Sequence, residues 1–226
     1  NHALLLSSFL GTAADEEPFV TQVVCDEAHT LEDAATNALE QRVEERVLRR
    51  ILQAISHPGG RGSLVHDARR RLGLAANDPL LFAIAQAVDT ALAALDGLAT
   101  QLYRYVTLKT VVGKAELERY GVRVSIDGGA LAAAGGPALK STADTLGQAL
   151  RTLRGTLDQL VEQASTVLQQ HQGQPSGRMR RVMRLARSLQ RDLREMSEQY
   201  SWFWSFAQAS SYVRVVELGR MEPGSA

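Results

Sequence analysis

The chain has 226 residues, 25 acidic and 25 basic side chains, 45% hydrophobic content and a single cysteine, Cys25. One cysteine excludes a disulfide framework and a complete Cys₄ metal or iron–sulfur site within this chain, and it favours a reducing, cytoplasmic compartment. The charge is uneven: residues 1–50 carry ten acids against four arginines, whereas residues 176–200 carry seven arginines against three acids. Local charge therefore says more about partners than net charge does.

Two short apolar runs open the chain, at residues 3–10 and 19–25. The first is too short to span a bilayer and lacks a basic leader, so we expect no membrane partner. The second is rich in β-branched residues and predicts a buried strand. Because the first residue is Asn and a predicted strand follows soon after, we expect the chain to be a piece of a longer protein.

Beyond these runs the apolar residues change to a helical period. From Asp33 the pattern predicts one helix that ends at His57, where Pro and Gly follow. Residues 63–72 predict a short basic helix. Asp78 before Pro79 predicts the start of an alanine-rich helix that continues to about Leu108. This helix is apolar on several sides, so we expect neighbours or a partner to bury it.

The second half of the chain predicts two long helices between two strands. Residues 121–129 alternate between apolar and polar, which indicates an edge strand. Residues 139–170 and 179–208 have apolar positions three and four apart, which indicates an antiparallel helical hairpin close to a coiled coil. Residues 212–218 predict a strand that returns to the layer of residues 19–25. The predicted fold class is mainly α, with a long antiparallel hairpin and a few strands.

The predicted strand at residues 19–25 runs directly into Asp26-Glu27-Ala28-His29. A helicase-type ATPase places two carboxylates there: Asp26 would hold Mg²⁺, and Glu27 would orient and deprotonate the attacking water. His29 would couple the nucleotide to the nucleic acid. The alternative is a chance acidic pair that caps the following helix. Four specified residues at the end of an apolar strand favour the catalytic interpretation.

A longer stretch around this motif resembles the DinG/XPD family of superfamily 2 DNA helicases. The residues that carry the resemblance are Asn1-His2-Ala3-Leu4-Leu5-Leu6 and Val24-Cys25-Asp26-Glu27-Ala28-His29-Thr30-Leu31-Glu32-Asp33. The resemblance implies that residues 1–35 belong to a RecA-like motor domain, residues 36–208 to a helical arch domain, and residues 209–226 to a return strand toward the motor domain. It also implies an ATP- and Mg²⁺-dependent protein that translocates 5′→3′ on single-stranded DNA in replication or repair.

The chain lacks a phosphate-binding loop, because Gly113-Lys114 is followed by Ala115 where Ser or Thr is needed. By resemblance, this loop and any iron–sulfur cluster would lie upstream, and the second motor domain downstream. We therefore expect that the chain alone is inactive as an ATPase and has the remaining motor domains of its parent as partners. The rival hypothesis is a non-enzymatic helical module that binds protein or DNA and carries a vestigial DEAH motif. The apolar helix that begins at Pro79 motivates it.

Five arginines of the last predicted helix share one face, because they are three or four residues apart: Arg180, Arg184, Arg187, Arg191 and Arg194. Arg151 and Arg154 of the preceding helix would face them. A basic stripe fits the phosphate backbone of single-stranded DNA. The alternative is a solvated face, partly paired with Asp192, Glu195 and Glu198.

An aromatic cluster at residues 200–206 ends the same helix. Clustered aromatics can stack on bases, but here we expect them to form the core where the helix rejoins the body of the protein. Trp202 has the more polar neighbours and is the better candidate for exposure. His57, His66 and His171 show no spacing typical of metal ligands.

Overall fold

The structure is a computed structural model, and it describes residues 42–57, 59, 62–72, 74, 77–110, 122–170, 177–205 and 214–218. The chain divides between Arg42 and Val43, and all helices and strands given below belong to the unit Val43–Ala226. The described part is mainly helical, with a two-stranded antiparallel sheet. This coarse fold class agrees with the sequence prediction.

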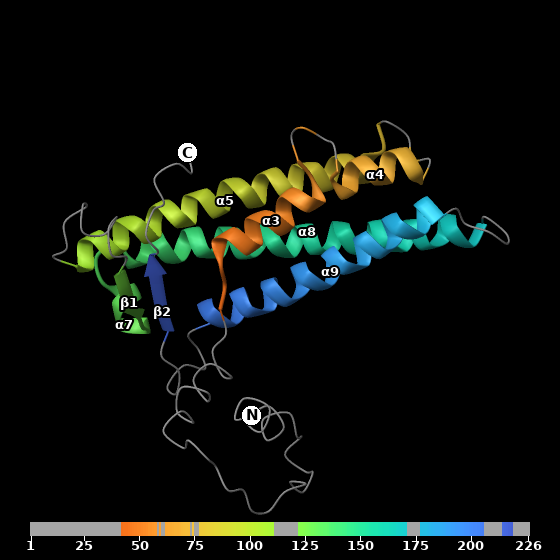
Figure 1. The fold of residues 1–226 in the computed structure, drawn as a ribbon. Helices are drawn as coiled ribbons and strands as arrows, with labels where there is room; N and C mark the ends of the chain where they lie inside the picture. The colour runs from red at the N-terminus through yellow and green to blue at the C-terminus, as the bar shows by residue number, and fades with distance from the viewer. Residues whose placement is uncertain are drawn as a thin grey trace, which may run out of the picture. The chain divides into compact units, whose positions relative to one another are not determined.

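The elements follow one another as α3 (Glu45–Ile55), α4 (Leu64–Arg71), α5 (Pro79–Lys109), β1 (Val122–Ile126), α7 (Gly128–Ala132), α8 (Gly136–Gln170), α9 (Gly177–Trp204) and β2 (Arg214–Leu218). α5 packs along α8, α8 packs along α9, and both α3 and α4 contact α5 and α9 (Figure 1). The helices therefore form an up-and-down four-helix bundle whose first member is broken between α3 and α4.

The long helices pack through buried residues that are alternately three and four positions apart. On α8 these residues are Leu139, Ala143, Leu146, Leu150, Leu153, Leu157, Leu160 and Ala164. α9 keeps the same spacing from Met179 to Tyr200, and α5 keeps it from Leu81 to Leu98. This spacing is typical of helices that pack nearly parallel or antiparallel as in a coiled coil. The predicted hairpin is confirmed, and α5 joins it as a third long helix.

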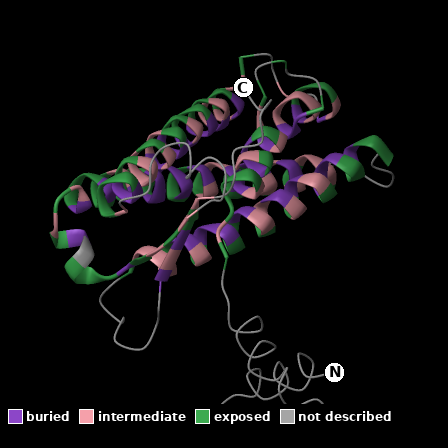
Figure 2. Cartoon of the chain, turned by 60° about the vertical axis from the view of Figure 1, so that its left-hand side comes forward, coloured by how far each residue is buried: buried purple, intermediate pink, exposed green. Residues whose placement is uncertain are grey.

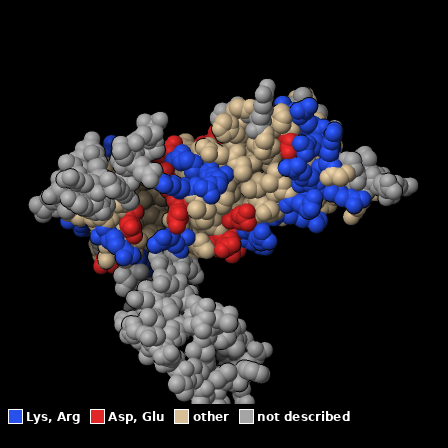
Figure 3. All heavy atoms as spheres, viewed as in Figure 1, with Lys and Arg blue, Asp and Glu red and all other residues tan. Residues whose placement is uncertain are grey.

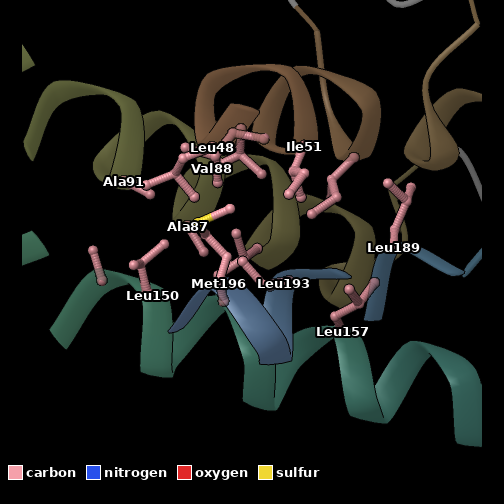
Figure 4. Close-up of a cluster of buried hydrophobic side chains, with 14 of the residues drawn as sticks. Leu48, Ile51, Ala87, Val88, Ala91, Leu150, Leu157, Leu189, Leu193 and Met196 are labelled. Carbon is pink, nitrogen blue, oxygen red and sulfur yellow. The ribbon is translucent and has the colours of Figure 1, made fainter. Parts of the chain in front are cut away.

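The core lies where the apolar faces of the four helical members meet (Figure 4). Leu48 of α3, Val88 of α5, Leu150 of α8 and Leu193 of α9 are all almost completely buried. Burying one such side chain is worth roughly 1.5–3 kcal/mol. Figure 2 shows the buried residues on the inner side of each helix and the exposed ones on the outer side. The outer faces are thus free to carry charge.

Two helices start at capping residues, of which the sequence analysis predicted the one before Pro79. Ser63 caps α4, because its Oγ accepts a hydrogen bond from the backbone N–H three residues on, at 3.4 Å. Asp78 caps α5: its Oδ1 accepts from the N–H groups of Leu80 at 2.9 Å and Leu81 at 3.3 Å. Pro79 occupies the first helical position, where its missing N–H is not needed.

The predicted single helix from Asp33 to His57 lies outside the described residues over 33–41, and it is wrong at residues 42–44. Residues 42–44 are not helical, Glu44 has an extended backbone (φ −103°, ψ 126°), and α3 begins only at Glu45. Glutamates at the start of a helix interact favourably with its dipole, which supports this starting point. The apolar period of the sequence runs through residues 42–44 and therefore could not show where α3 begins.

Two further boundaries differ from the sequence prediction. α9 ends at Trp204, not at Gln208, and Ser205 is not helical. The short helix α7 was not predicted, because its glycines were interpreted as the end of a strand. The turn into α8 needs glycine at Gly136, where an added Cβ would lie 2.1 Å from the carbonyl oxygen of Leu131.

The sheet pairs β1 with β2 in antiparallel register, with Val122 opposite Leu218 and Ile126 opposite Arg214. Both strands lie within the predicted ranges. The partner predicted for β2, the strand at residues 19–25, lies outside the described residues, and the partner that the structure describes is β1. The sheet packs against the bundle through the buried side chains of Ile126 and Val216.

Among the described helices, α5 is long and apolar enough to cross a membrane by length and composition alone. In this structure α5 packs against α3, α4 and α8, and side chains such as Ile84, Val88 and Ala91 are fully buried. Neighbours within the chain therefore bury one side of this helix, whereas Phe82 and Leu108 of α5 stay exposed. This arrangement is consistent with a soluble protein.

Candidate nucleic-acid interface

The residues predicted for catalysis, Asp26, Glu27 and His29, lie outside the described residues, as does the Mg²⁺ ligand role given to Asp26. Within the part of the chain that the structure describes, there is no group of three or more His, Cys, Asp or Glu side chains that could hold a metal ion. The candidate site that can be built from described residues is the arginine face of α9.

The arginine row consists of the five predicted residues Arg180, Arg184, Arg187, Arg191 and Arg194, and all five are exposed. They lie on the outer face of α9 because the buried face is occupied by residues such as Val182, Leu189 and Leu193. One helix face thus anchors α9 in the core while the other presents a line of guanidinium groups. The structure brings the whole predicted row together.

Charge is not uniform along the row. From residue 177 to residue 191 the helix has no Asp or Glu, and acids appear only at Asp192, Glu195 and Glu198. Arg191 lies 3.6 Å from Asp192, and Arg194 lies 3.5 Å from Glu198. The first three members of the row form no ion pair with any described residue. The amino-terminal half of α9 is therefore the more basic half.

A small groove beside the row connects α9 with α8. It has a volume of about 250 Å³ and is lined by Arg154 and Asp158 of α8 and by Gln190, Arg191 and Arg194 of α9. The carboxylate of Asp158 accepts a hydrogen bond at Oδ1 from Nε2 of Gln190, at 2.7 Å. Three guanidinium groups thus line one groove whose carboxylate already has a partner. Such a groove suits a phosphate group.

The two α8 arginines proposed to face the row behave differently. Arg154 lines the groove together with two members of the row. Arg151 donates instead to Oε1 of Gln148 on its own helix, at 2.9 Å, and it does not line the groove. Only Arg154 extends the basic surface from α9 onto α8.

A larger groove of about 910 Å³ lies along α5 and α8 and is open to solvent. Small and hydroxyl-bearing side chains such as Ala83, Thr90 and Thr152 line it, with Lys140 and Asp144 as charged residues. One charge of each sign gives this groove no preference for a polyanion. It therefore does not extend the basic surface.

The aromatic cluster at the end of α9 packs largely against the core, as expected. Tyr200 is buried, and the rings of Phe203 and Trp204 meet edge to face at 5.2 Å between centroids. Trp202 is half-buried, and the guanidinium of Arg214 lies 5.3 Å from its ring centroid. One face of Trp202 is therefore engaged within the protein. Phe206 lies outside the described residues.

Arg214 of β2 caps the carboxyl-terminal end of α9 by donating hydrogen bonds to backbone carbonyl groups there. Its Nε donates to the carbonyl oxygen of Phe203 at 2.7 Å, and its Nη2 donates to that of Ser205 at 2.7 Å. The last carbonyl groups of a helix have no partner within the helix, and a cation there also interacts favourably with the helix dipole. This buried arginine was not singled out from the sequence.

The structure also adds arginines that were not assigned to the site. Arg178 and Arg181 are exposed in the first two turns of α9, and Arg69 and Arg70 are exposed on α4, which packs against α9. Figure 3 shows Lys and Arg gathered over the end of the bundle where α4 and the start of α9 lie. The sequence marked residues 63–72 as basic but could not show that they lie beside α9.

No protein-family model, curated protein or solved structure matches this chain.

Proposed function

We propose that this chain is part of a DinG-like, ATP-dependent DNA helicase, in which the α8–α9 hairpin belongs to an arch domain that guides single-stranded DNA. The observation that carries the proposal is the arginine row, five exposed guanidinium groups along one helix. A single row fits a single strand, because one strand presents one line of phosphates. Exposed guanidinium groups bind phosphate oxygens through charge-assisted, often bidentate hydrogen bonds.

The row is also placed on a rigid support. α9 is held by its apolar face along α8 and by α3 and α4 on its other flank. A strand bound to the row would therefore contact a surface that is formed in advance, which lowers the entropic cost of binding. The groove lined by Arg154, Arg191 and Arg194 provides a place for one phosphate beside the row.

The motor function in this proposal rests on the motif at residues 26–29 and on the resemblance that it carries. Asp26 would hold the Mg²⁺ of bound ATP, Glu27 would orient and deprotonate the attacking water, and His29 would couple nucleotide state to DNA. ATP would be bound by a phosphate-binding loop in the whole protein, together with its remaining motor domains. Cytoplasmic localisation and a role in replication or repair belong to the same proposal.

The second candidate is a non-enzymatic helical module that binds DNA or protein and carries a vestigial DEAH motif. One observation favours it: the described residues of the bundle share one core and form the basic surface by themselves. The apolar face of α5, which first suggested a partner chain, is packed against α3, α4 and α8. A DNA-binding module is therefore the form of this alternative that the surface supports.

ATP hydrolysis by the full-length protein that contains this chain separates the two candidates. Turnover should be measured with and without single-stranded DNA, for the wild type and for Glu27→Gln. We expect DNA-stimulated turnover that is lost in Glu27→Gln while nucleotide binding is kept, because the amide can hydrogen-bond a water but cannot take its proton.

Retained turnover in Glu27→Gln would contradict the assignment of Glu27 as the base. No turnover in either protein, with DNA binding intact, would favour the non-enzymatic module. Nucleotide binding by the variant, followed with a fluorescent ATP analogue, is the control for folding.

A further inference from the structure

The groove between α8 and α9 lies where the arginine row ends. Arg154 of α8 and Arg191 and Arg194 of α9 line it, together with Asp158 and Gln190. The hydrogen bond of 2.7 Å between Gln190 and Asp158 joins the two helices, so the two walls of the groove are held together. Its volume of about 250 Å³ is below the roughly 300–1,000 Å³ of pockets that hold drug-sized ligands. The groove therefore suits one charged group.

The guanidinium groups of this groove keep N–H donors that are not used within the described part of the chain. Nε of Arg191 lies 3.6 Å from Asp192, and Nε of Arg194 lies 3.5 Å from Glu198. Both distances exceed the roughly 2.7–3.2 Å of an N–H···O hydrogen bond. Among the described residues, Arg154 has no ion-pair or hydrogen-bond partner. An anion in the groove can therefore accept hydrogen bonds from all three arginines.

The line of arginines along α9 runs into carboxylates just beyond the groove. An α-helix turns by about 100° per residue, so Glu198 lies within about 20° of Arg191 around the helix axis, and Glu195 lies within about 40°. Both glutamates are exposed, and both follow Arg194 in the chain. Because like charges repel, a phosphate chain that follows the arginines in this direction should end at the groove.

A terminal phosphate differs from a phosphate within a strand in its charge and in its oxygen atoms. An internal phosphate has a single negative charge, whereas a terminal phosphate has about −1.5 to −2 near pH 7 and three acceptor oxygens. Three guanidinium groups match three oxygens, and they outnumber the carboxylate among the lining residues, Asp158. The larger charge also lets a terminal phosphate compete with the carboxylates of Asp192 and Glu198 better than an internal phosphate does.

We propose that the groove between α8 and α9 binds the terminal phosphate of a single DNA strand whose other phosphates lie along the arginine row. The ligand class is a phosphate monoester at the end of a polynucleotide. The proposal rests on the proposed function for the choice of a DNA strand as the polynucleotide. It adds that the chain recognises the end of a strand as well as its backbone.

Competition binding with oligothymidines of equal length and different ends tests the proposal. The whole chain is bound to an internally labelled oligothymidine, and fluorescence anisotropy follows its displacement. The unlabelled competitors carry a phosphate at the 5′ end, at the 3′ end or at neither end. The groove variant is Arg154→Ala. The matched control is Arg151→Ala, which removes the same charge one turn earlier on α8 from an exposed side chain that does not line the groove.

We expect a phosphate at one of the two ends to strengthen binding by the wild type about tenfold, because it accepts additional charge-assisted hydrogen bonds. The end that gives this gain is the end that the groove holds. Arg151→Ala should keep the gain, whereas Arg154→Ala should reduce it to about twofold or less. A wild type that binds all three competitors equally would overturn the inference. A gain as large in Arg154→Ala as in Arg151→Ala would overturn it too, because the added charge alone would then explain it.

The failure of the proposed function is visible separately in the same experiment. Arg180→Ala with Arg184→Ala removes contacts of the row that lie away from the groove, so it should weaken binding of the strand without a terminal phosphate. If it does not, the role of the arginine row is contradicted. The gain from a terminal phosphate is still measured within each variant, because it is a ratio of two affinities.

Inorganic phosphate tests the groove without any DNA. We expect its ³¹P resonance to broaden more with Arg151→Ala than with Arg154→Ala, and equal broadening would overturn the inference. Circular dichroism of each variant shows whether the bundle is intact. Arg154 is half-buried, so Arg154→Gln, which keeps most of the side chain and removes its charge, replaces Arg154→Ala if that variant unfolds.

Discussion

Tyr200 joins α9 to α8 through a single buried hydroxyl. Its Oη donates to the carbonyl oxygen of Ala143 at 2.8 Å, and its ring lies in the core. Burial raises the pKa of the Tyr200 phenol far above its usual range, and the negative charge of Asp144 adds to this effect. The phenol must therefore stay protonated for this contact to exist.

We expect Tyr200→Phe to lower the free energy of unfolding by about 1 kcal/mol near neutral pH, because one buried hydrogen bond is lost. The wild type should lose stability as the pH rises above about 10, where the phenol ionises in the unfolded chain but not in the folded one. The sign follows from the raised pKa: the folded state favours the proton, so this contribution is complete below pH 10 and falls above it. Tyr200→Phe should lose less stability than the wild type over the same rise in pH.

Urea denaturation over this pH range measures both effects. Tyr103→Phe is the matched control, since it removes a hydroxyl of α5 that forms no hydrogen bond among the described residues. An alkaline loss of stability that is the same in Tyr200→Phe and in the wild type would contradict this account of Tyr200.

Residues differ in how much of their role can be predicted from the sequence. The caps at Ser63 and Asp78 were predictable, because a capping side chain acts on its own backbone a few residues on. The exposure of the arginine row was also predictable from helical spacing. The burial of Arg214 was not, because it depends on a strand that packs at the end of a helix earlier in the sequence.

At the scale of one element, α9 combines a continuous apolar face with a polarised charged face. Its first half has no acid, whereas Arg194 in its second half has Glu195 beside it and Glu198 at 3.5 Å. The ion pair itself is exposed, with side-chain exposures of 69% and 63%, so it contributes little to stability. Its effect on a phosphate is larger, because the nearby carboxylates repel the same charge that the arginine attracts.

We therefore expect Arg184→Ala to weaken binding of single-stranded DNA more than Arg194→Ala does. One lost phosphate contact should lower the salt slope for a single strand by about 0.7, and Arg194→Ala should lower it by less. Anisotropy titrations with oligothymidine at several salt concentrations measure the slopes. Equal slopes for the two variants would show that Glu195 and Glu198 do not weaken the contact at Arg194.

Helix existence was easier to predict than helix ends. α5 and α8 were predicted with starts and ends close to those observed, because a long apolar period marks both helices and Asp78 marks the start of α5. The predicted start of α3 was wrong because the apolar period of the sequence continues through residues 42–44, where the backbone is not helical. The predicted end of α9 was wrong because Arg214, a residue of β2, donates hydrogen bonds to carbonyl groups at the end of this helix.

At the scale of the whole bundle, the sequence predicted the α8–α9 hairpin but not its surroundings. A short connection makes α8 and α9 antiparallel neighbours, whereas the packing of α5 along α8 and of α4 along α9 involves residues far apart in the chain. The basic side chains of α4 and of the start of α9, such as Arg70 and Arg178, come near one another through this second kind of contact. The sequence showed the arginines of each helix but not that the two helices pack together.

Besides the apolar contacts of Ile126 and Val216, the sheet is held to the bundle by the hydrogen bonds of Arg214 to the end of α9. We expect Arg214→Ala to lower the free energy of unfolding by about 2–3 kcal/mol, because buried hydrogen bonds from a charged group to the end of α9 are lost. Hydrogen exchange should become faster in β1 and β2 than in α5 and α8. Chemical denaturation and hydrogen exchange by mass spectrometry measure the two effects.

Arg123→Ala is the control for this substitution, since Arg123 pairs across the same sheet with Glu217 at 3.5 Å and both side chains are more than half exposed. An exposed pair of this kind contributes about 0–1 kcal/mol. If Arg123→Ala destabilised the protein as much as Arg214→Ala does, the buried guanidinium would not be what fastens the sheet.

The position of the two strands in the chain has a consequence for how the protein folds. β1 precedes the α8–α9 hairpin and β2 follows it, so their pairing joins segments that are separated by two long helices. Local contacts form faster than distant ones, because closing a long loop costs more entropy. We therefore expect the hairpin to form first and to shorten the distance between the strands. The sheet would then be the last part of the bundle to form and the first to unfold.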